Sequence, residues 1–147
     1  MKIAIGADHA GVRLKDELAR WLAGGGHEVE DLGTDSEASV DYPDFARAVA
    51  KAVSSGAAER GVLVCGSGLG VAIAANKIAG IRAATCNDLY TARMARAHND
   101  ANVVTLGARV VGDGLAEEIV QVFLATPFEG GERHTRRVRK ITDLESC

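Results

Sequence analysis

The chain lacks any long apolar run, and this absence excludes one class of protein. No stretch of its 147 residues reaches the roughly 18 consecutive apolar residues that a membrane-spanning helix requires. The opening residues, MKIAIGADHAG, also lack the apolar segment and small-residue cleavage site of a secretory signal. We therefore expect a soluble, cytoplasmic protein with no membrane partner.

An excess of charge of one sign is also missing, because 17 basic residues are balanced by 20 acidic ones for a formal net charge of −3. Such a balance creates no global field that would draw the protein to nucleic acid or to a membrane surface. Nucleic acid is therefore not an expected partner, and any site for an anion must be local.

Cysteine is scarce and irregularly placed. Cys65, Cys86 and Cys147 form an odd number with no CxxC spacing, which argues against a disulfide framework and against a cysteine metal centre. The histidines and acidic residues do not fall at ligand spacings either, so we expect no metal site. The thiols should be reduced.

What the chain does contain is a regular alternation of short strand-like runs and helix-length segments. The strand-like runs are KIAIG (2–6), HEVEDLG (27–33), GVLVC (61–65), IRAATC (81–86) and NVVTLG (102–107). Parallel strands need a crossover between them, and here that crossover is a helix. The pattern predicts one domain over residues 1–147, a Rossmann-like three-layer α/β/α sandwich around a five-stranded parallel sheet.

Three helices can be predicted in more detail. The first covers residues 12–23 and ends at a run of three glycines. Asp113 is expected to cap a later helix. The closing segment GGERHTRRVRK predicts a short charged helix over about 132–141 with no strand after it. Such an appendage often packs on a partner subunit, and we expect that here.

Candidate site residues follow the strands, because ligands of open parallel sheets bind beyond the carboxyl ends of the strands. Asp8 and His9 follow the first strand, and Cys65 ends the third. His98, with Asn99, ends the helix before the fifth strand. Each has a structural alternative: a helix cap at Asp8, a small buried thiol at Cys65, and a solvated helix end at His98.

The segment VLVCGSGLGV (62–71) does not match three familiar motifs. Its glycines lack the dinucleotide-binding spacing, and Val71 stands where a phosphate-binding loop needs lysine or a cysteine phosphatase needs arginine. A glycine turn can still point several N–H groups at one oxyanion, and a helix N-terminus would lower the pKa of Cys65. A tight turn with no ligand remains the alternative.

The C-terminal segment forms a local basic patch. Arg133 and Arg137 lie four residues apart, which places them on one face of a helix where two guanidinium groups can grip a phosphate. A solvated charged face is the alternative.

Five ordered segments resemble those of the ribose-5-phosphate isomerase B family, which also includes galactose-6-phosphate isomerase subunits. They are IAIGADHAG (3–11), DYPDFA (41–46), VCGSGLGVAIAANKIAGIRAA (64–84), ARAHNDANVVTLGARVVG (95–112) and GGERHTRRV (130–138). The resemblance implies an aldose–ketose isomerase that uses neither metal nor cofactor. It would interconvert D-ribose 5-phosphate and D-ribulose 5-phosphate through an enediolate.

The resemblance also implies roles for individual residues. Cys65 would be the base that takes the C2 proton, His98 would open the furanose ring, and Asp8 would bind hydroxyls or shuttle protons, together with Asn99 and Tyr42. The turn would hold the enediolate oxygens through the residues Gly66, Ser67, Gly68, Leu69 and Gly70. The remaining ligand-binding and phosphate-binding positions would be His9, Arg109, Arg133 and Arg137.

In the family, the site lies between two subunits, so the resemblance implies a homodimer or larger, with His98 supplied by the second subunit. Two positions depart from the family pattern: Glu132 is added ahead of Arg133, and Val71 stands near the glutamate base of another branch. Two other functions stay open. One is the same chemistry on allose 6-phosphate, galactose 6-phosphate or a tetrose phosphate, and the other is a phosphate-ligand binding module without turnover.

Overall fold

The computed structural model describes residues 1–147 and contains five strands and six α-helices. In chain order they are β1 (Lys2–Ala7), α1 (Val12–Gly24), β2 (Glu28–Asp31), α2 (Tyr42–Ser54), β3 (Arg60–Cys65), α3 (Leu69–Ala75), β4 (Ala83–Thr85), α4 (Leu89–Ala97), β5 (Val103–Gly107), α5 (Asp113–Ala125) and α6 (Glu132–Asp143). A short 3₁₀ turn over Leu144–Ser146 ends the chain. No helix is both long and apolar enough to cross a membrane.

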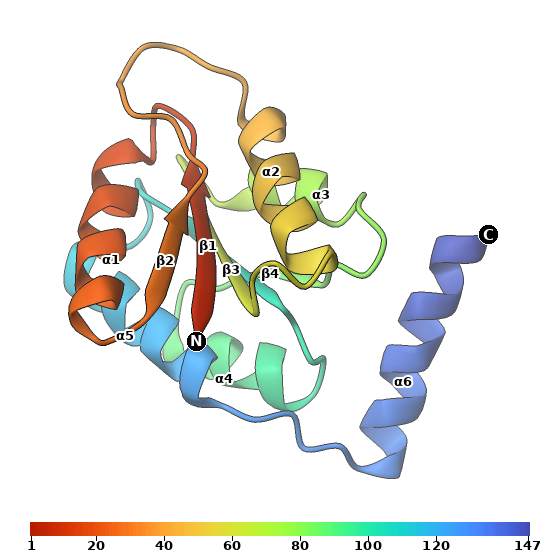
Figure 1. The fold of residues 1–147 in the computed structure, drawn as a ribbon. Coiled ribbons are helices and arrows are strands. Elements are labelled where there is room, and N and C mark those ends of the chain that lie inside the picture. The colour runs from red at the N-terminus through yellow and green to blue at the C-terminus, as the bar shows by residue number, and fades with distance from the viewer.

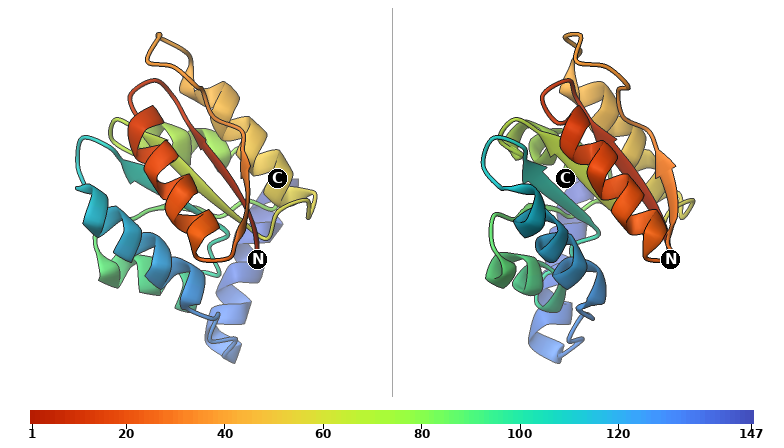
Figure 2. Two further views of the ribbon diagram at one scale, coloured as in Figure 1. Left: turned by 60° about the vertical axis from the view of Figure 1, so that its left-hand side comes forward. Right: turned by 90° about the vertical axis from the view of Figure 1, so that its left-hand side faces the viewer.

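The five strands form one parallel sheet in the order β2-β1-β3-β5-β4. Helices α1, α4 and α5 cover one face of the sheet, and α2 and α3 cover the other (Figures 1 and 2). The predicted three-layer sandwich is confirmed. The strands are parallel because a helix between successive strands returns the chain to the edge of the sheet where the previous strand began.

The core lies in two layers because neighbouring side chains of a strand point to opposite faces. Ile3 and Ile5 of β1 pack toward α1 and α5, together with Leu18 and Phe123. Ala4, between them in sequence, faces α2 instead. Full burial of a side chain such as Phe123 contributes about 1.5–3 kcal/mol, so these two layers hold the sheet rigid beneath its loops.

The direction in which the chain adds strands across the sheet reverses between β1 and β3, since β2 lies on one side of β1 and the later strands lie on the other. The loops that follow β1 and β3 therefore emerge side by side. The Asp8 N–H donates to the Val64 carbonyl at 3.3 Å. A Cβ on Gly11 would lie 2.8 Å from Val64, so only glycine permits this approach. Asp8 and Cys65 are thus brought to one edge of the sheet.

Two details of the sequence prediction were wrong. Both outer strands are shorter than predicted, since β2 spans Glu28–Asp31 and β4 spans Ala83–Thr85, and each pairs with a neighbour on one side only. Asp113 is the first residue of α5 rather than its cap, which is Gly112. Its carboxylate instead accepts hydrogen bonds from Arg13 of α1 at 3.1 and 3.2 Å, which lower the pKa of Asp113.

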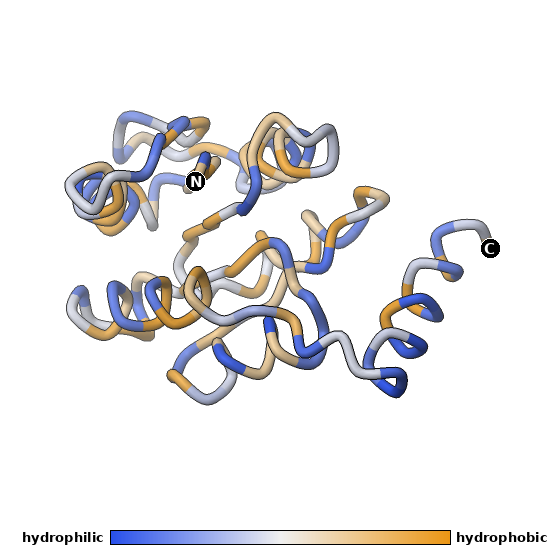
Figure 3. The backbone as a smooth tube through the Cα atoms, turned by 60° about the horizontal axis from the view of Figure 1, so that its bottom comes forward, coloured by the Kyte–Doolittle hydropathy of each residue, from blue (hydrophilic) through white to orange (hydrophobic).

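Helix α6 stands apart from the sandwich (Figure 1). The charged helix predicted over 132–141 spans Glu132–Asp143, and most of its length is hydrophilic (Figure 3). Its one buried residue is His134. Glu132 opens the helix, so Arg133 and Arg137 both lie within it and keep their four-residue spacing. Packing of α6 on a partner subunit stays a prediction.

Candidate active site

The first part of the site is the glycine turn after β3. Cys65 ends the strand and is 4% exposed, and its Sγ accepts a hydrogen bond from the Gly68 N–H at 3.1 Å. Gly68 has a φ of 79°, and a Cβ there would lie 2.9 Å from the Leu106 carbonyl carbon. The Gly68 carbonyl accepts from Thr105 Oγ1 at 2.8 Å. The turn is therefore held in one conformation with a backbone N–H directed at the sulfur.

Four further residues predicted from the sequence surround this turn. The ring of Tyr42 lies against Gly70, where a Cβ would come within 2.8 Å of ring atoms. Arg109 donates its backbone N–H to the Gly66 carbonyl at 3.0 Å. Ser67 and Leu69 are exposed at the tip of the turn, where Ser67 Oγ accepts from the Leu69 N–H at 3.2 Å. The Arg109 guanidinium lies beside Gly66, where a Cβ would come within 3.2 Å of it, so a ring, a guanidinium group and a hydroxyl lie around the turn.

Asp8 and His9 lie next to the same turn. The Asp8 carboxylate is buried and accepts from the N–H groups of Ala10 and Gly11 at 3.0 and 3.2 Å. It does not cap α1, whose N-cap is Gly11. His9 Nδ1 accepts from the Val40 N–H at 3.2 Å, which ties the loop between β2 and α2 to this edge. We call Asp8, His9, Tyr42, residues 65–70 and Arg109 the thiol cluster.

His98 lies elsewhere. It caps the C-terminus of α4, just before β5 begins. In a parallel α/β layer the helices run opposite to the strands, so the end of α4 lies at the amino edge of the sheet, away from the thiol cluster (Figure 1). Asn99 is exposed beside it. A single subunit therefore does not join His98 to Cys65.

The turn that carries His98 is rigidly held. Asp100 has a positive φ of 46°, an uncommon conformation outside glycine. Its carboxylate pairs with Arg96 at 2.7 Å and with Arg82 at 3.1 Å. Arg96 is almost fully buried and also donates to the Ala101 carbonyl at 2.6 Å. These contacts set the direction in which His98 leaves the helix.

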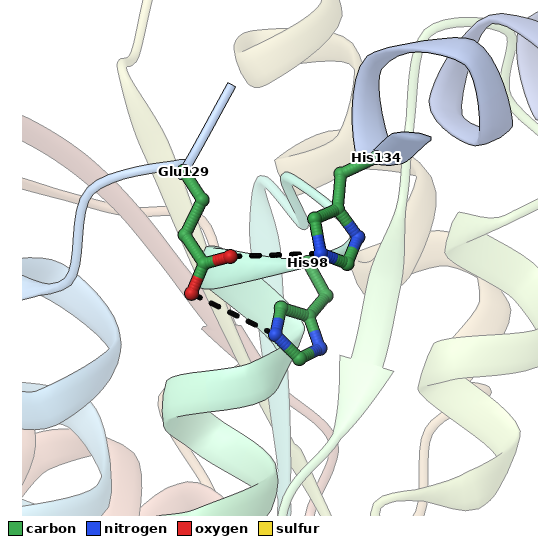
Figure 4. A group of neighbouring side chains, drawn as sticks. All are labelled: His98, Glu129 and His134. Carbon is green, nitrogen blue, oxygen red and sulfur yellow. Dashed lines mark ion pairs between the residues drawn. The ribbon is translucent and has the colours of Figure 1, made fainter. Parts of the chain in front are cut away.

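His98 meets two residues that sequence reasoning assigned no role. Glu129 lies 3.7 Å from His98 Nε2 and 3.5 Å from His134 Nε2, one carboxylate oxygen toward each ring (Figure 4). The two imidazole rings stack with centroids 4.3 Å apart and planes inclined by 10°. We call His98, Glu129 and His134 the histidine cluster.

A metal ion is one ligand that two histidines and a carboxylate can bind, because their candidate ligand atoms lie within 4.8 Å of one another. Imidazole nitrogens, however, bind a metal in the plane of the ring. Two nearly parallel rings stacked 4.3 Å apart cannot place one ion in both planes. As it stands the histidine cluster is a carboxylate facing two stacked rings at ion-pair distance, which is not the geometry of a ligand set.

Charge and burial also act on the histidine cluster. Burial lowers the pKa of His134, and the neighbouring His98 and Arg133 act in the same direction. The Arg133 guanidinium lies 3.4 Å from His134 Nε2. Arg133 and Arg137 thus extend from the helix that carries His134, on the side of the molecule where His98 lies, and both are exposed.

The other two thiols differ from Cys65. Burial raises the pKa of Cys86 to about 11, so this thiol stays protonated, and its Sγ lies 3.7 Å from the Ala84 carbonyl. Cys147 is exposed at the end of the chain. Of the three, Cys65 alone lies in a glycine turn at the edge where the sheet changes direction.

A parallel α/β sandwich with a thiol, a glycine turn and basic side chains beyond its strands defines a class of enzyme that acts on small anionic molecules. Comparison with known proteins makes this specific. A family model described as Ribose/Galactose Isomerase matches residues 3–141, and the chain belongs to this family.

Individual relatives agree. The chain is 50% identical over 144 residues to ribose-5-phosphate isomerase B of Escherichia coli K12, covering 98% of this chain and 96% of that protein. It is 46% identical over 132 residues to D-erythrulose-4-phosphate isomerase of Pectobacterium atrosepticum, with 89% and 87% covered. The structure of Clostridium thermocellum ribose-5-phosphate isomerase B superposes with a TM-score of 0.98 at 55% identity, over 99% and 98% of the two chains. The protein is an enzyme, a sugar-phosphate isomerase of the ribose-5-phosphate isomerase B type.

Proposed function

We propose that the protein interconverts D-ribose 5-phosphate and D-ribulose 5-phosphate through an enediolate, without a metal or a cofactor. The observation that carries this proposal is the Gly68 N–H directed at Cys65 Sγ from 3.1 Å inside a glycine turn. The thiolate is the form that can take a proton from carbon, and this N–H is placed to donate to the sulfur. Relatives named for ribose 5-phosphate, at 50% and 55% identity, support this choice of substrate.

The proton transfer is assigned to Cys65. The thiolate takes the C2 proton of the open-chain aldose, and the electrons of that C–H bond form the C1–C2 double bond of the enediolate. The proton then returns to C1 and the O2 hydroxyl proton passes to O1, which leaves the carbonyl at C2. N–H groups of the turn stabilise the negative oxygen, as donors preorganised for developing charge.

The remaining residues bind the substrate and open its ring. We assign ring opening to His98 of a second subunit, because His98 and Cys65 of one subunit lie at opposite edges of the sheet. Asp8, Tyr42 and Asn99 would bind sugar hydroxyls. His9, Arg109, Arg133 and Arg137 would bind the phosphate, for which guanidinium groups are well suited. The active form is then a homodimer or a larger assembly.

The test follows the carbon-bound protons. The protein is incubated with ribose 5-phosphate in D₂O containing EDTA, and NMR follows ketose formation and deuterium entry. We expect turnover unaffected by EDTA, with deuterium on the carbon that receives the proton. A requirement for added metal, or ketose formed by direct hydride transfer without deuterium, would overturn the mechanism.

Two substitutions test the assignments. Cys65→Ala should abolish deuterium exchange while sugar phosphate still binds, because the arginines remain. Arg137→Ala should weaken phosphorylated substrates far more than their unphosphorylated analogues. Arg139→Ala is the matched control, since Arg139 is exposed on the same helix but lies two residues on, toward the opposite face. Equal losses from both arginine variants would remove the phosphate role of Arg137.

A second substrate deserves the same assay. The relative named D-erythrulose-4-phosphate isomerase is 46% identical, so we propose a tetrose phosphate as the alternative substrate. Ratios of kcat/KM for tetrose, pentose and hexose phosphates decide between them. A non-catalytic binding module is the weaker alternative, because the relatives are isomerases.

A further inference from the structure

We propose that Glu129 is a positioning residue for ring opening: its carboxylate fixes which nitrogen of His98 carries the proton and so determines which nitrogen faces the sugar. The inference rests on the proposed function, in which His98 opens the furanose. It concerns a residue outside the groups that sequence reasoning assigned to the site.

The contact between the two residues is the first step. Glu129 Oε1 lies 3.7 Å from His98 Nε2, and the His98 ring has no other hydrogen-bond or ion-pair partner within the subunit. Figure 4 shows the second ring nitrogen of His98 turned away from the carboxylate. The separation exceeds a hydrogen bond by about 0.5 Å, and catalytic contacts commonly tighten when substrate binds.

Proton counting gives the second step. An ionised carboxylate only accepts hydrogen bonds, and a neutral imidazole carries one N–H and one bare nitrogen. His98 therefore presents Nε2–H to Glu129 and leaves Nδ1 free to take the proton of the anomeric hydroxyl. As the C1–O4 bond breaks and the C1 carbonyl forms, this proton passes to the ring oxygen O4. Without the carboxylate both tautomers are available, and the one with Nδ1–H cannot act as that base.

The third step is that Glu129 is itself held in place. Its backbone N–H donates to the Ala97 carbonyl at 3.0 Å, next to His98 at the end of α4. His134, 7% exposed, stacks on the His98 ring and faces the other oxygen of the carboxylate. The hydrogen bond of the Glu129 backbone fixes the position from which its side chain extends. The stacked His134 ring limits rotation of the His98 side chain.

The test compares two substrates with the same phosphate and the same number of carbons. Ribose 5-phosphate is mostly a furanose and must be opened. Ribulose 5-phosphate cannot form a furanose, because the oxygen that would close the ring carries the phosphate, so its C1 proton exchanges without any ring chemistry. Loss of ring opening therefore slows the first reaction and spares the second, whereas loss of Cys65 stops both.

Three variants give the expected pattern. Glu129→Met removes the acceptor at similar side-chain length, and we expect kcat for ribose 5-phosphate to fall at least about tenfold. Deuterium exchange at C1 of ribulose 5-phosphate should stay within about twofold of the wild-type rate. Glu129→Gln keeps an acceptor oxygen and should recover most of the loss. Glu132→Met, which removes an exposed carboxylate at the start of α6, is the control and should change neither rate.

The ¹⁵N shifts of His98 provide a readout that is independent of turnover. We expect protonated Nε2 and bare Nδ1 in the wild type and a tautomer mixture in Glu129→Met. Glu129→Met combined with His98→Asn should be no slower on ribose 5-phosphate than His98→Asn alone, since Glu129 acts through His98.

The failures of the two proposals are distinguishable. Wild-type protein that neither converts ribose 5-phosphate nor exchanges the C1 proton contradicts the proposed function. Wild-type activity together with a Glu129→Met variant that slows both reactions equally, or slows neither, overturns the role of Glu129.

Discussion

Two inactive variants should restore activity when mixed, because the thiol cluster and the histidine cluster lie at opposite edges of one sheet. Cys65→Ala removes the base, and His98→Asn removes the ring-opening group. If every site combines Cys65 of one subunit with His98 of the other, each variant alone has only defective sites. A heterodimer of the two has one site in which both residues are intact and one in which both are replaced.

For the proposed homodimer the magnitude follows from counting its sites. Random exchange of equal amounts of the variants gives about half heterodimers, and each contributes one intact site of two. The mixture should therefore reach about one quarter of the wild-type rate per subunit. If Cys65 and His98 of the same subunit formed the site, no mixture would contain an intact site.

The assay measures ribulose 5-phosphate formation after the variants are unfolded and refolded together, so that subunits exchange. Variants refolded separately and mixed afterwards, at low temperature, are the control and should stay inactive. A co-refolded mixture that stays as inactive as its parents, although mass spectrometry detects heterodimers, refutes the shared site.

Three further predictions concern Cys86, Arg96 and His134. Iodoacetamide at neutral pH should modify the exposed Cys147 but leave Cys86, whose pKa is raised to about 11 by burial, unmodified in peptide mass spectra. Labelling of Cys86 at a similar rate would show that the core around it opens. Arg96→Met should lower the free energy of unfolding, measured in urea, by about 3 kcal/mol, because Asp100 and the Ala101 carbonyl lose a buried hydrogen-bond donor. Arg93→Met, at an exposed position of the same helix, is the control and should change this free energy little. Amide exchange of α6, corrected for intrinsic rates, should become faster as the pH falls below 6.5, the ordinary pKa of histidine. The pKa of His134 is lowered in the folded protein, so the stability that neutral His134 gives to the docked helix is present above that pH and is lost below it. Protection of α6 that is the same at pH 8 and pH 5 would contradict this.

Much of the fold could be predicted from the sequence because strand periodicity and helix periodicity are local. The end of the strand at Cys65 is predicted correctly and its start to within one residue, since apolar residues fill it and glycines follow it. The edge strands were overestimated because their ends depend on a neighbouring strand, which periodicity does not report. Asp113 looked like a cap for the same reason: its partner Arg13 lies 100 positions away.

The thiol cluster was largely predictable, and the histidine cluster was not. Cys65, Asp8 and His9 follow strands, and a parallel sheet brings such residues to one edge. Glu129 and His134 join His98 only because the segment after α5 runs back along the end of α4, where Glu129 bonds to Ala97. No local pattern encodes that path. The sequence offered only one indication of this cluster, which is that Glu129 and His134 lie close to a basic segment.

The small contact of helix α6 with its own subunit bears on how the enzyme should behave when it is diluted. A helix of 12 residues is marginally stable by itself, and α6 buries only His134 against its own subunit. If α6 packs on a second subunit as predicted, its order, and with it the placement of Arg133 and Arg137, draws on the free energy of association. By mass action the affinity of the proposed phosphate site would then depend on enzyme concentration. KM measured at nanomolar enzyme should exceed KM measured at micromolar enzyme.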